Sequence, residues 1–226
     1  MINDLLNYDL KIYQDINAFK FSIDSVLLAE FVNINFRAKN IIDLCSGNAP
    51  IPMILSTKFN KNIVGVELQK SIYELGKKSI EFNKINNIHF INNDIKNIID
   101  LFDYKFDIIT CNPPYFKVDS SLSKVNDYNE KAIARHELFI TLEDVIYISS
   151  KIINFSGSLY LVHRCDRFIE ILDLLKKYRF GLRRLQFVYD NDKSSSCFIL
   201  IEAKYNCKDD LKVMNPLYID KYLEGK

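Results

Sequence analysis

The sequence predicts an α/β fold built on one doubly wound, mostly parallel sheet. Apolar runs typical of buried strands alternate with segments of helical periodicity, and this alternation is characteristic of parallel sheets made of β-α-β units. The last two runs flank a polar segment and are expected to form an antiparallel hairpin. The seven expected strands cover residues 40–43, 63–67, 88–94, 106–111, 157–163, 184–189 and 197–203.

The helices expected between these strands carry ordinary start signals. Pro50 and Pro52 fall in the first turn of one helix, where proline is tolerated. Thr141 and Asp144 have the spacing of an N-cap and its capping-box acid. The other expected helices are an N-terminal one over 21–32, capped by Ser22 or Asp24, and those over 69–83, 138–154 and 167–178. The apolar face of 69–83 comprises Ile72, Leu75, Gly76, Ser79, Ile80 and Phe82.

Length and composition are those of a small intracellular domain. The 226 residues suffice for one domain with a sizeable core, which we divide into an N-terminal helical extension (1–38), a core (39–205) and a tail (206–226). The five cysteines are scattered and show neither a disulfide framework nor zinc-ligand spacing. Because no run approaches the ~20 apolar residues of a membrane helix and the N-terminus lacks a basic start, we expect a cytoplasmic monomer without metal.

Acidic residues stand at the ends of the first three core strands. Asp43 precedes a loop that contains Gly47, while Glu67 and Asp94 end the second and third strands. In doubly wound sheets, ligands bind at the carboxyl ends of the strands, and an acid after the second strand accepts the ribose hydroxyls of a nucleotide-like cofactor. An acid or Asn after the third strand can accept from an adenine amino group. The pattern therefore predicts a nucleotide-type cofactor site.

The fourth strand, 106–111, ends in Asn112-Pro113-Pro114-Tyr115. Two prolines fix φ twice and remove two backbone donors, so this turn presents bare carbonyl oxygens. A planar ring could stack on Tyr115 while its amino group donates to the Asn112 side chain and the Pro113 carbonyl. This pattern is typical of enzymes that methylate amino nitrogens conjugated to a ring or carbonyl. The alternative is a proline turn with a solvent-facing tyrosine.

With these motifs, the chain resembles the class I, Rossmann-like S-adenosylmethionine-dependent methyltransferases that carry an Asn-Pro-Pro-Tyr motif. Within that class it is most similar to the tRNA adenine-N6 methyltransferases that modify position 37 of a valine tRNA. The narrower resemblance rests on residues 21–29, 134–137, 185–189 and 216–218. It implies S-adenosylmethionine as cofactor, S-adenosylhomocysteine as product, tRNA as partner and N6-methyladenosine as the modified nucleoside.

The resemblance also implies roles for individual residues. Those implied to hold the target amino group are Asn112, Pro113, Pro114 and Tyr115. Those implied to bind the cofactor are Phe21, Ser22, Asp24, Asp43, Cys45, Gly47, Asn48, Glu67, Leu68, Asn93, Asp94, Ile95 and Asn112. Those implied to contact the substrate are Tyr115, Phe116, Arg135, His136, Arg183 and Arg184.

The chain departs from the family pattern in its first loop. The family usually has a second glycine after Gly47, whereas this chain has Asn48-Ala49-Pro50. Asn tolerates positive φ better than other non-glycine residues, so we expect Asn48 to be left-handed. The departure bears on the affinity for the cofactor rather than on its identity.

Basic residues gather late in the chain, although the formal net charge is only +1. They are Arg164, Arg167, Lys176, Lys177, Arg179, Arg183 and Arg184. Such a cluster can follow an RNA backbone, but a solvated helix face would give the same pattern. His89 and His163 lie within expected strands, so we assign no general base. The polar segment 117–130 is either a surface loop or a lid ordered by substrate.

Several other functions share parts of this pattern. A protein-glutamine methyltransferase uses the same Asn-Pro-Pro-Tyr chemistry, but the short segment before Asn40 leaves little room for the N-terminal helical domain of that class. A DNA adenine methyltransferase would need a recognition domain. A non-catalytic RNA-binding module would not need the strand-end acids, and a nicotinamide-dependent oxidoreductase leaves Asn-Pro-Pro-Tyr unexplained.

Overall fold

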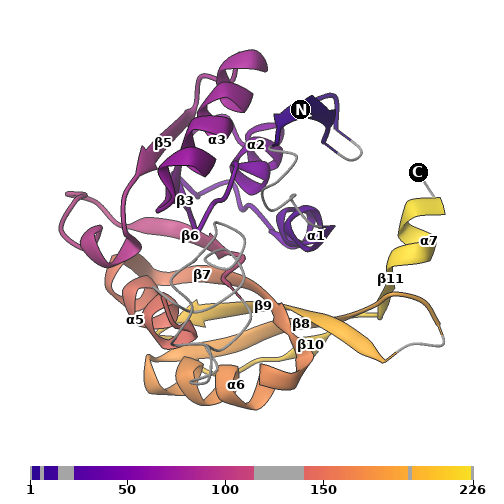
Figure 1. Cartoon of the computed structure of the whole chain (residues 1–226). Helices are drawn as coiled ribbons and strands as arrows, with labels where there is room; N and C mark the ends of the chain where they lie inside the picture. The colour runs from indigo at the N-terminus through magenta and orange to yellow at the C-terminus, as the bar shows by residue number, and fades with distance from the viewer. Residues whose placement is uncertain (1, 6–7, 15–22, 115–139, 193–194, 225–226) are drawn as a thin grey trace, which may run out of the picture.

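The computed structural model describes residues 2–5, 8–14, 23–114, 140–192 and 195–224. Its main element is a nine-stranded sheet of order β10-β8-β9-β7-β6-β3-β4-β5, with β11 also paired to β8 (Figure 1). The strands are β3 (Asn40–Leu44), β4 (Asn62–Glu67), β5 (Ile88–Asn92), β6 (Phe106–Cys111), β7 (Ile153–Arg164), β8 (Phe180–Tyr189), β9 (Ser196–Tyr205), β10 (Lys212–Val213) and β11 (Leu217–Tyr218).

Strand direction brings the carboxyl ends of several strands to one edge of the sheet. The strands from β3 to β7 are parallel, and β9 is antiparallel to both β7 and β8. The carboxyl ends of β3, β4, β5 and β6 therefore lie at the same edge, where doubly wound sheets bind ligands. The predicted α/β fold with a terminal antiparallel hairpin is confirmed.

Helices cover both faces of this sheet. On one face lie α1 (Ile23–Phe31) and α2 (Pro50–Ser56), and on the other α5 (Leu142–Ile152) and α6 (Phe168–Lys177) (Figure 1). Neighbouring strand residues point to opposite faces, so Ile41 packs in the α1–α2 core while Ile42 packs in the α5–α6 core. The remaining helices are α3 (Lys70–Phe82), α7 (Ile219–Glu224), and the 3₁₀ turns η1 (Ile95–Asn97) and η3 (Cys165–Arg167).

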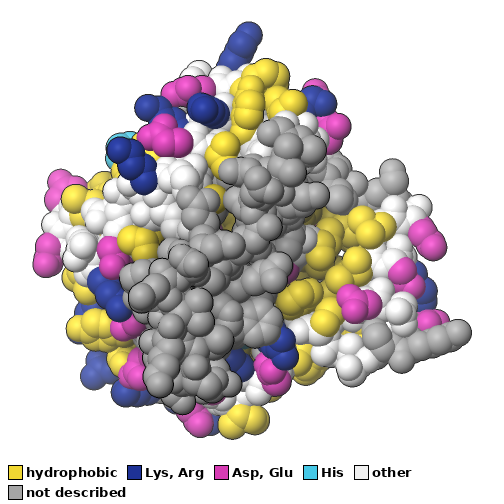
Figure 2. Space-filling model, in the orientation of Figure 1, with side chains coloured by type: hydrophobic (Ala, Val, Ile, Leu, Met, Phe, Trp, Pro, Cys, Tyr) yellow, Lys and Arg dark blue, Asp and Glu magenta, His cyan; other side chains and the backbone are white. Residues whose placement is uncertain are grey.

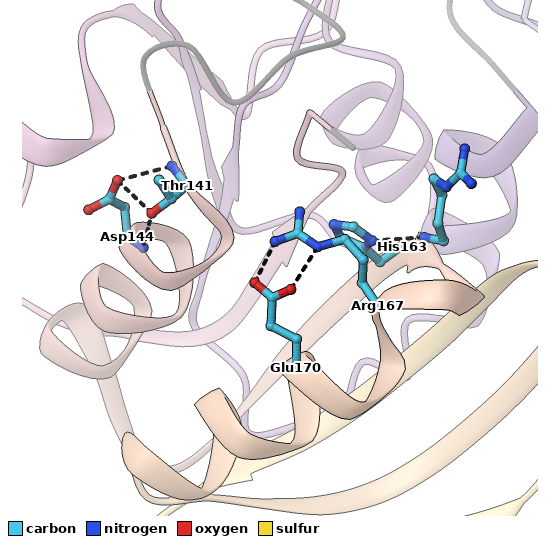
Figure 3. Close-up of polar contacts among 6 residues, drawn as sticks. Thr141, Asp144, His163, Arg167 and Glu170 are labelled. Atoms are coloured by element: carbon cyan, nitrogen blue, oxygen red, sulfur yellow. Dashed lines mark hydrogen bonds and ion pairs between the residues drawn. The ribbon is translucent and has the colours of Figure 1, made fainter. Parts of the chain in front are cut away.

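Several expected boundaries were confirmed and others were wrong. The capping box of Thr141 and Asp144 opens α5 as predicted (Figure 3). That helix ends at Ile152 rather than at residue 154, because the chain continues directly into β7. Phe82 does not share the buried face of α3: it is 53% exposed, and its ring makes a T-shaped contact with the Tyr13 ring, with centroids 5.9 Å apart.

Both ends of the chain hold strands that the sequence did not predict. The N-terminal extension is not only helical, since β1 (Ile2–Asp4) and β2 (Lys11–Tyr13) form an antiparallel pair. In the tail, β10 and β11 add to the edge of the sheet beside β8. The hydroxyl of Tyr222 donates to Glu30 Oε1 at 2.7 Å, which links α7 to α1.

Candidate active site

The predicted site residues Asp43, Glu67 and Asn112 lie at or next to the carboxyl ends of neighbouring parallel strands. Leu44, the last residue of β3, pairs with Val66 of β4 and with Cys111 of β6. On the far side of β4, Glu67 pairs with Asn92 of β5. The sheet therefore brings together the loop after β3, the acid of β4, the turn after β5 and the proline turn after β6.

The loop after β3 is shaped by three left-handed residues. Cys45, Gly47 and Ala49 have φ values of 56°, 57° and 69°. The expected left-handed conformation of Asn48 was wrong, because Ala49 adopts it instead as the N-cap of α2. Asn48 is 6% exposed and its Nδ2 donates to the Tyr13 carbonyl at 2.9 Å. The side chain that replaces the second glycine thus ties this loop to β2.

Gly47 leaves room for a ligand at this loop. A Cβ atom added to Gly47 would meet no described atom within 4 Å. Ser46 fixes the loop to the strands β3 and β4. Its hydroxyl donates to the Asp43 carbonyl at 2.9 Å and accepts from Val66 N at 3.1 Å. Backbone amides can therefore approach a bound molecule closely, in a loop that is already fixed.

Glu67 is buried where β4 ends, with 6% of its surface exposed. Its Oε2 accepts from Gly47 N at 2.9 Å and its Oε1 accepts from Gln69 N at 2.8 Å, while burial raises its pKa. A carboxylate has about four lone-pair sites. Backbone amides of Gly47, Leu68 and Gln69 thus hold this carboxylate in place, and Glu67 fixes the first loop while retaining acceptor capacity for a ligand hydroxyl. Leu68, which follows it, is 41% exposed.

Asp43 is fully buried near the end of β3. Thr110 Oγ1 donates to Asp43 Oδ1 at 2.5 Å, whereas Oδ2 has no hydrogen-bond partner among the described residues. Burial raises the pKa of this carboxyl to about 7. A buried carboxylate oxygen without a partner is costly, and a positively charged ligand would relieve that cost.

The turn after β5 holds polar groups near Glu67. Asn93 N donates to the Glu67 carbonyl at 3.1 Å, and Asn93 Oδ1 accepts from Asp94 N at 2.8 Å. Asp94 caps η1 by accepting from Lys96 N at 2.9 Å, and Ile95 is buried. This turn can present Asp94 to a purine amino group and Ile95 to its ring.

The turn after β6 meets helix α1. Asn112 Nδ2 donates to Ser25 Oγ at 2.9 Å, and Pro113 is buried. Asp24, next to Ser25 on α1, is 2% exposed and accepts from Ser25 N at 2.8 Å. The predicted site residues Phe21, Ser22, Tyr115, Phe116, Arg135 and His136, together with segment 117–130, lie outside the described residues.

Two cysteines border the same edge. Cys45 opens the first loop and Cys111 ends β6, and burial raises the pKa of Cys111. All five cysteines are free thiols in the structure. Cys111 is buried among apolar residues of the α5–α6 core.

The two predicted substrate arginines of β8 do not form one basic surface. Arg184 pairs with Glu202 of β9, donates to the Phe31 carbonyl at 2.9 Å, and lies over the Phe31 ring at 4.3 Å. Arg183 instead pairs with exposed Asp210 at 2.9 Å. The structure thus commits Arg184 to contacts inside the protein, which argues against the predicted RNA contact.

Other members of the basic cluster also pair with acids. Arg167 is 9% exposed, and its Nη2 lies 2.6 Å from Glu170 Oε1 beside His163 (Figure 3). Burial, with the Arg167 charge, lowers the pKa of His163 to about 4, and its Nδ1 accepts from Arg164 N. On the face shown in Figure 2, basic and acidic side chains are interspersed. Arg164 likewise pairs with Asp166 and Lys177 with Glu143, so acidic partners interrupt the cluster.

Solved structures of other proteins share this fold. A structure described as a predicted O-methyltransferase of Agrobacterium tumefaciens superposes with a TM-score of 0.68 at 22% identity, over 89% of this chain and 96% of that one. M. jannaschii TYW2 in complex with AdoMet superposes with a TM-score of 0.59 at 14% identity, over 90% and 84%. The fold is that of the class I, S-adenosylmethionine-dependent methyltransferases, as predicted.

Sequence comparison then gives the family. Residues 35–177 match the family described as a methyltransferase domain, and the chain belongs to that family. A tRNA1(Val) (adenine(37)-N6)-methyltransferase of Cytophaga hutchinsonii is 25% identical over 84% of this chain and 78% of that protein. One of Histophilus somni is 32% identical over 67% and 63%. A release factor glutamine methyltransferase of Aliivibrio fischeri is 38% identical over only 35% and 28%.

The chain has a methyltransferase domain, and the described part of its site fits S-adenosylmethionine, the cofactor that the sequence predicted. Within the described residues, the space beside Gly47, the acceptor oxygens of Glu67 and the lack of a hydrogen-bond partner for Asp43 Oδ2 suit a nucleoside that carries a positive charge. No helix in the described part of the chain is long and apolar enough to cross a membrane. Three or more metal-ligating side chains do not come together anywhere within the described ranges.

We expect Glu67→Ala to weaken S-adenosylmethionine binding by about 100-fold or more, because each hydrogen bond to a charged group contributes ~1.5–3 kcal/mol. Calorimetric titration measures the effect, and circular dichroism checks the fold. The control is Glu74→Ala, which removes an exposed glutamate from α3. Unchanged affinity in Glu67→Ala would exclude Glu67 from the cofactor site.

Cofactor affinity should depend on pH through Asp43. With a folded-state pKa of about 7, the carboxyl is mostly neutral at pH 6 and mostly ionised at pH 8, so affinity should rise roughly ten-fold between them. Without cofactor the sign is opposite: a raised acid pKa stabilises the fold at low pH, and this contribution is lost as pH rises through 7. Asp43→Asn should abolish both trends. Calorimetry and thermal melting that show the same trends in wild type and Asp43→Asn would contradict this assignment.

Proposed function

We propose that this protein transfers a methyl group from S-adenosylmethionine to N6 of an adenine in tRNA, at position 37 of a valine tRNA. The observation that carries the proposal is the position of Asn112. It directly follows β6, the strand next to β3 and its cofactor loop, and α1 holds its amide. An amide and the Pro113 carbonyl at this place suit an amino group brought beside the cofactor.

The target amino nitrogen must be made more nucleophilic before it can accept a methyl group. Its lone pair is delocalised into the ring, so it is a poor nucleophile. Hydrogen bonds from its N–H groups to the Asn112 oxygen and the Pro113 carbonyl favour a tetrahedral nitrogen with its lone pair localised. When bound, S-adenosylmethionine supplies an electrophilic methyl group on a sulfonium. The methylated nitrogen is cationic and loses its extra proton to water, so no protein base is needed.

Positioning supplies most of the acceleration in this scheme. Two reactants held in line can lower a barrier by ~7–11 kcal/mol. Pro113 and Pro114 stiffen the turn that presents the acceptors. The target base must leave its stack, and a base in an anticodon loop is already unpaired, which lowers the cost of that step.

The choice of tRNA rests on similarity. The relatives of Cytophaga hutchinsonii and Histophilus somni are named for adenine 37 of tRNA1(Val), and they match along most of this chain. The glutamine methyltransferase matches over 80 residues, which supports shared chemistry more than a shared substrate. The same proposal places the protein in the cytoplasm, as a single-domain monomer that binds tRNA.

The proposal is tested by incubating the protein with labelled S-adenosylmethionine and either total unmodified tRNA or a purified bacterial release factor. Nucleoside mass spectrometry should find N6-methyladenosine in the tRNA, and the release factor should remain unlabelled. Label on a release-factor glutamine, with unmodified tRNA, would replace this proposal by protein-glutamine methylation.

A further inference from the structure

Helix α1 supplies a side chain, that of Ser25, which contacts Asn112 in the turn after β6. Ser25 is 6% exposed, and its Oγ accepts from Asn112 Nδ2 at 2.9 Å. The two residues are 87 positions apart in the chain. Ser25 itself lies in the first turn of α1, where its backbone N–H donates to the Asp24 carboxylate.

The side-chain amide of Asn112 has two unlike ends, and its chemistry depends on which end faces the target. An oxygen accepts the N–H of an amino group, whereas an NH₂ group would oppose it with another donor. The terminal torsion of Asn is broad and roughly two-fold, so rotamer preference alone does not choose between the ends. The bond to Ser25 directs the NH₂ group toward α1, so the amide oxygen points away from Ser25.

Helix α1 is a rigid support for this contact. At its carboxyl end, Arg184 donates to the Phe31 carbonyl and lies over the Phe31 ring. Just beyond, the Tyr160 hydroxyl of β7 donates to the Asn33 carbonyl at 3.2 Å. Sites held by packed elements are more precise than sites on loops. Ser25 thus connects Asn112 to a helix that the sheet fixes independently.

We propose that Ser25 is a positioning residue for methyl transfer: it orients the Asn112 amide so that the oxygen accepts from the target amino group. The proposal rests on the proposed function, because it assumes that Asn112 binds an amino nitrogen. In this role Ser25 acts through Asn112 and contacts neither the cofactor nor the target base. Its effect should therefore appear in turnover and not in the binding of either reactant.

The test compares Ser25→Ala, Ser25→Cys and Ser25→Thr in steady-state methylation of tRNA. Alanine and the nearly isosteric cysteine, a weak acceptor, should lower kcat on the order of 10- to 100-fold, with KM for tRNA and cofactor Kd unchanged. Threonine keeps the hydroxyl and should restore most of the activity. Ser149→Ala is the control, since the hydroxyl of that buried serine of α5 donates to the Val145 carbonyl of the same helix at 2.7 Å. Wild-type kcat in Ser25→Ala, or an equal loss in Ser25→Thr, would overturn the proposal.

A second measurement does not depend on the substrate. In wild-type protein one Asn112 side-chain amide proton should exchange slowly with solvent, and its resonance should shift and exchange faster in Ser25→Ala. Unchanged side-chain resonances would overturn the orientation role even if tRNA methylation were established. The predicted change, together with wild-type protein that leaves tRNA unmodified, would uphold the contact and reject the proposed function.

Discussion

Asn112→Ala is expected to reduce kcat for tRNA methylation by on the order of 10²- to 10³-fold, with little change in cofactor affinity. Removing one preorganised polar group from an active site typically has an effect of this size. The role of Asn112 begins at the target amino group, so the cofactor should bind as before. Single-turnover methylation and calorimetry measure the two quantities separately.

The matched control for this variant is Asn87→Ala. Asn87 also uses its side-chain NH₂ group to hold backbone carbonyls, those of Phe59 and Lys61, but it precedes β5 and so lies at the opposite edge of the sheet. We expect near-normal turnover there. Full activity in Asn112→Ala would remove the amide from the mechanism.

Arg184→Ala is expected to destabilise the fold by ~3–5 kcal/mol, because it leaves a buried carboxylate without its partner. The Glu202 side chain is 9% exposed, and Arg184 also holds the end of α1 through Phe31. Arg183→Ala is the neighbouring control. Its partner, Asp210, is 83% exposed, and exposed ion pairs contribute only ~0–1 kcal/mol. Urea unfolding of both variants gives the comparison.

The same pair of variants separates two interpretations of β8. If Arg184 is structural, its loss should lower stability without changing how tRNA affinity responds to salt. If it contacts phosphate, stability should hold while the salt dependence of tRNA binding becomes shallower. The second outcome would restore the RNA contact that the sequence predicted and contradict the structural role.

The sequence was informative where the physical signal is local. Strands β3, β4 and β6 are buried on both faces and therefore appear as continuous apolar runs, as in 40–44 and 106–111. The hairpin of β1 and β2 gave no such signal. These strands have three residues each, and β2 is fixed by partners distant in sequence, such as Asn83 Oδ1 at 2.9 Å from Lys11 N.

In the site, too, features with a local sequence signal were predicted, and features set by distant contacts were not. Residues at strand ends, such as Glu67 and Asn112, were predicted to lie at one edge because parallel strands impose it. Ser25 was within the family-like segment 21–29, but its contact with Asn112 depends on how α1 packs. The left-handed residue after Gly47 was assigned to Asn48 from propensity, whereas the tertiary bond to Tyr13 holds Asn48 in another conformation. Propensity is a weak guide where such contacts compete.

Methyl transfer to N6 of adenine 37 can be tested directly by comparing two valine tRNA transcripts. A valine tRNA transcript and a variant transcript with guanine at position 37 are incubated with the protein and S-adenosylmethionine, then digested and mapped by mass spectrometry. We expect N6-methyladenosine at position 37 of the first transcript and no methylation of the second. A methyl group at any other position, or equal methylation of both transcripts, would contradict the proposed function.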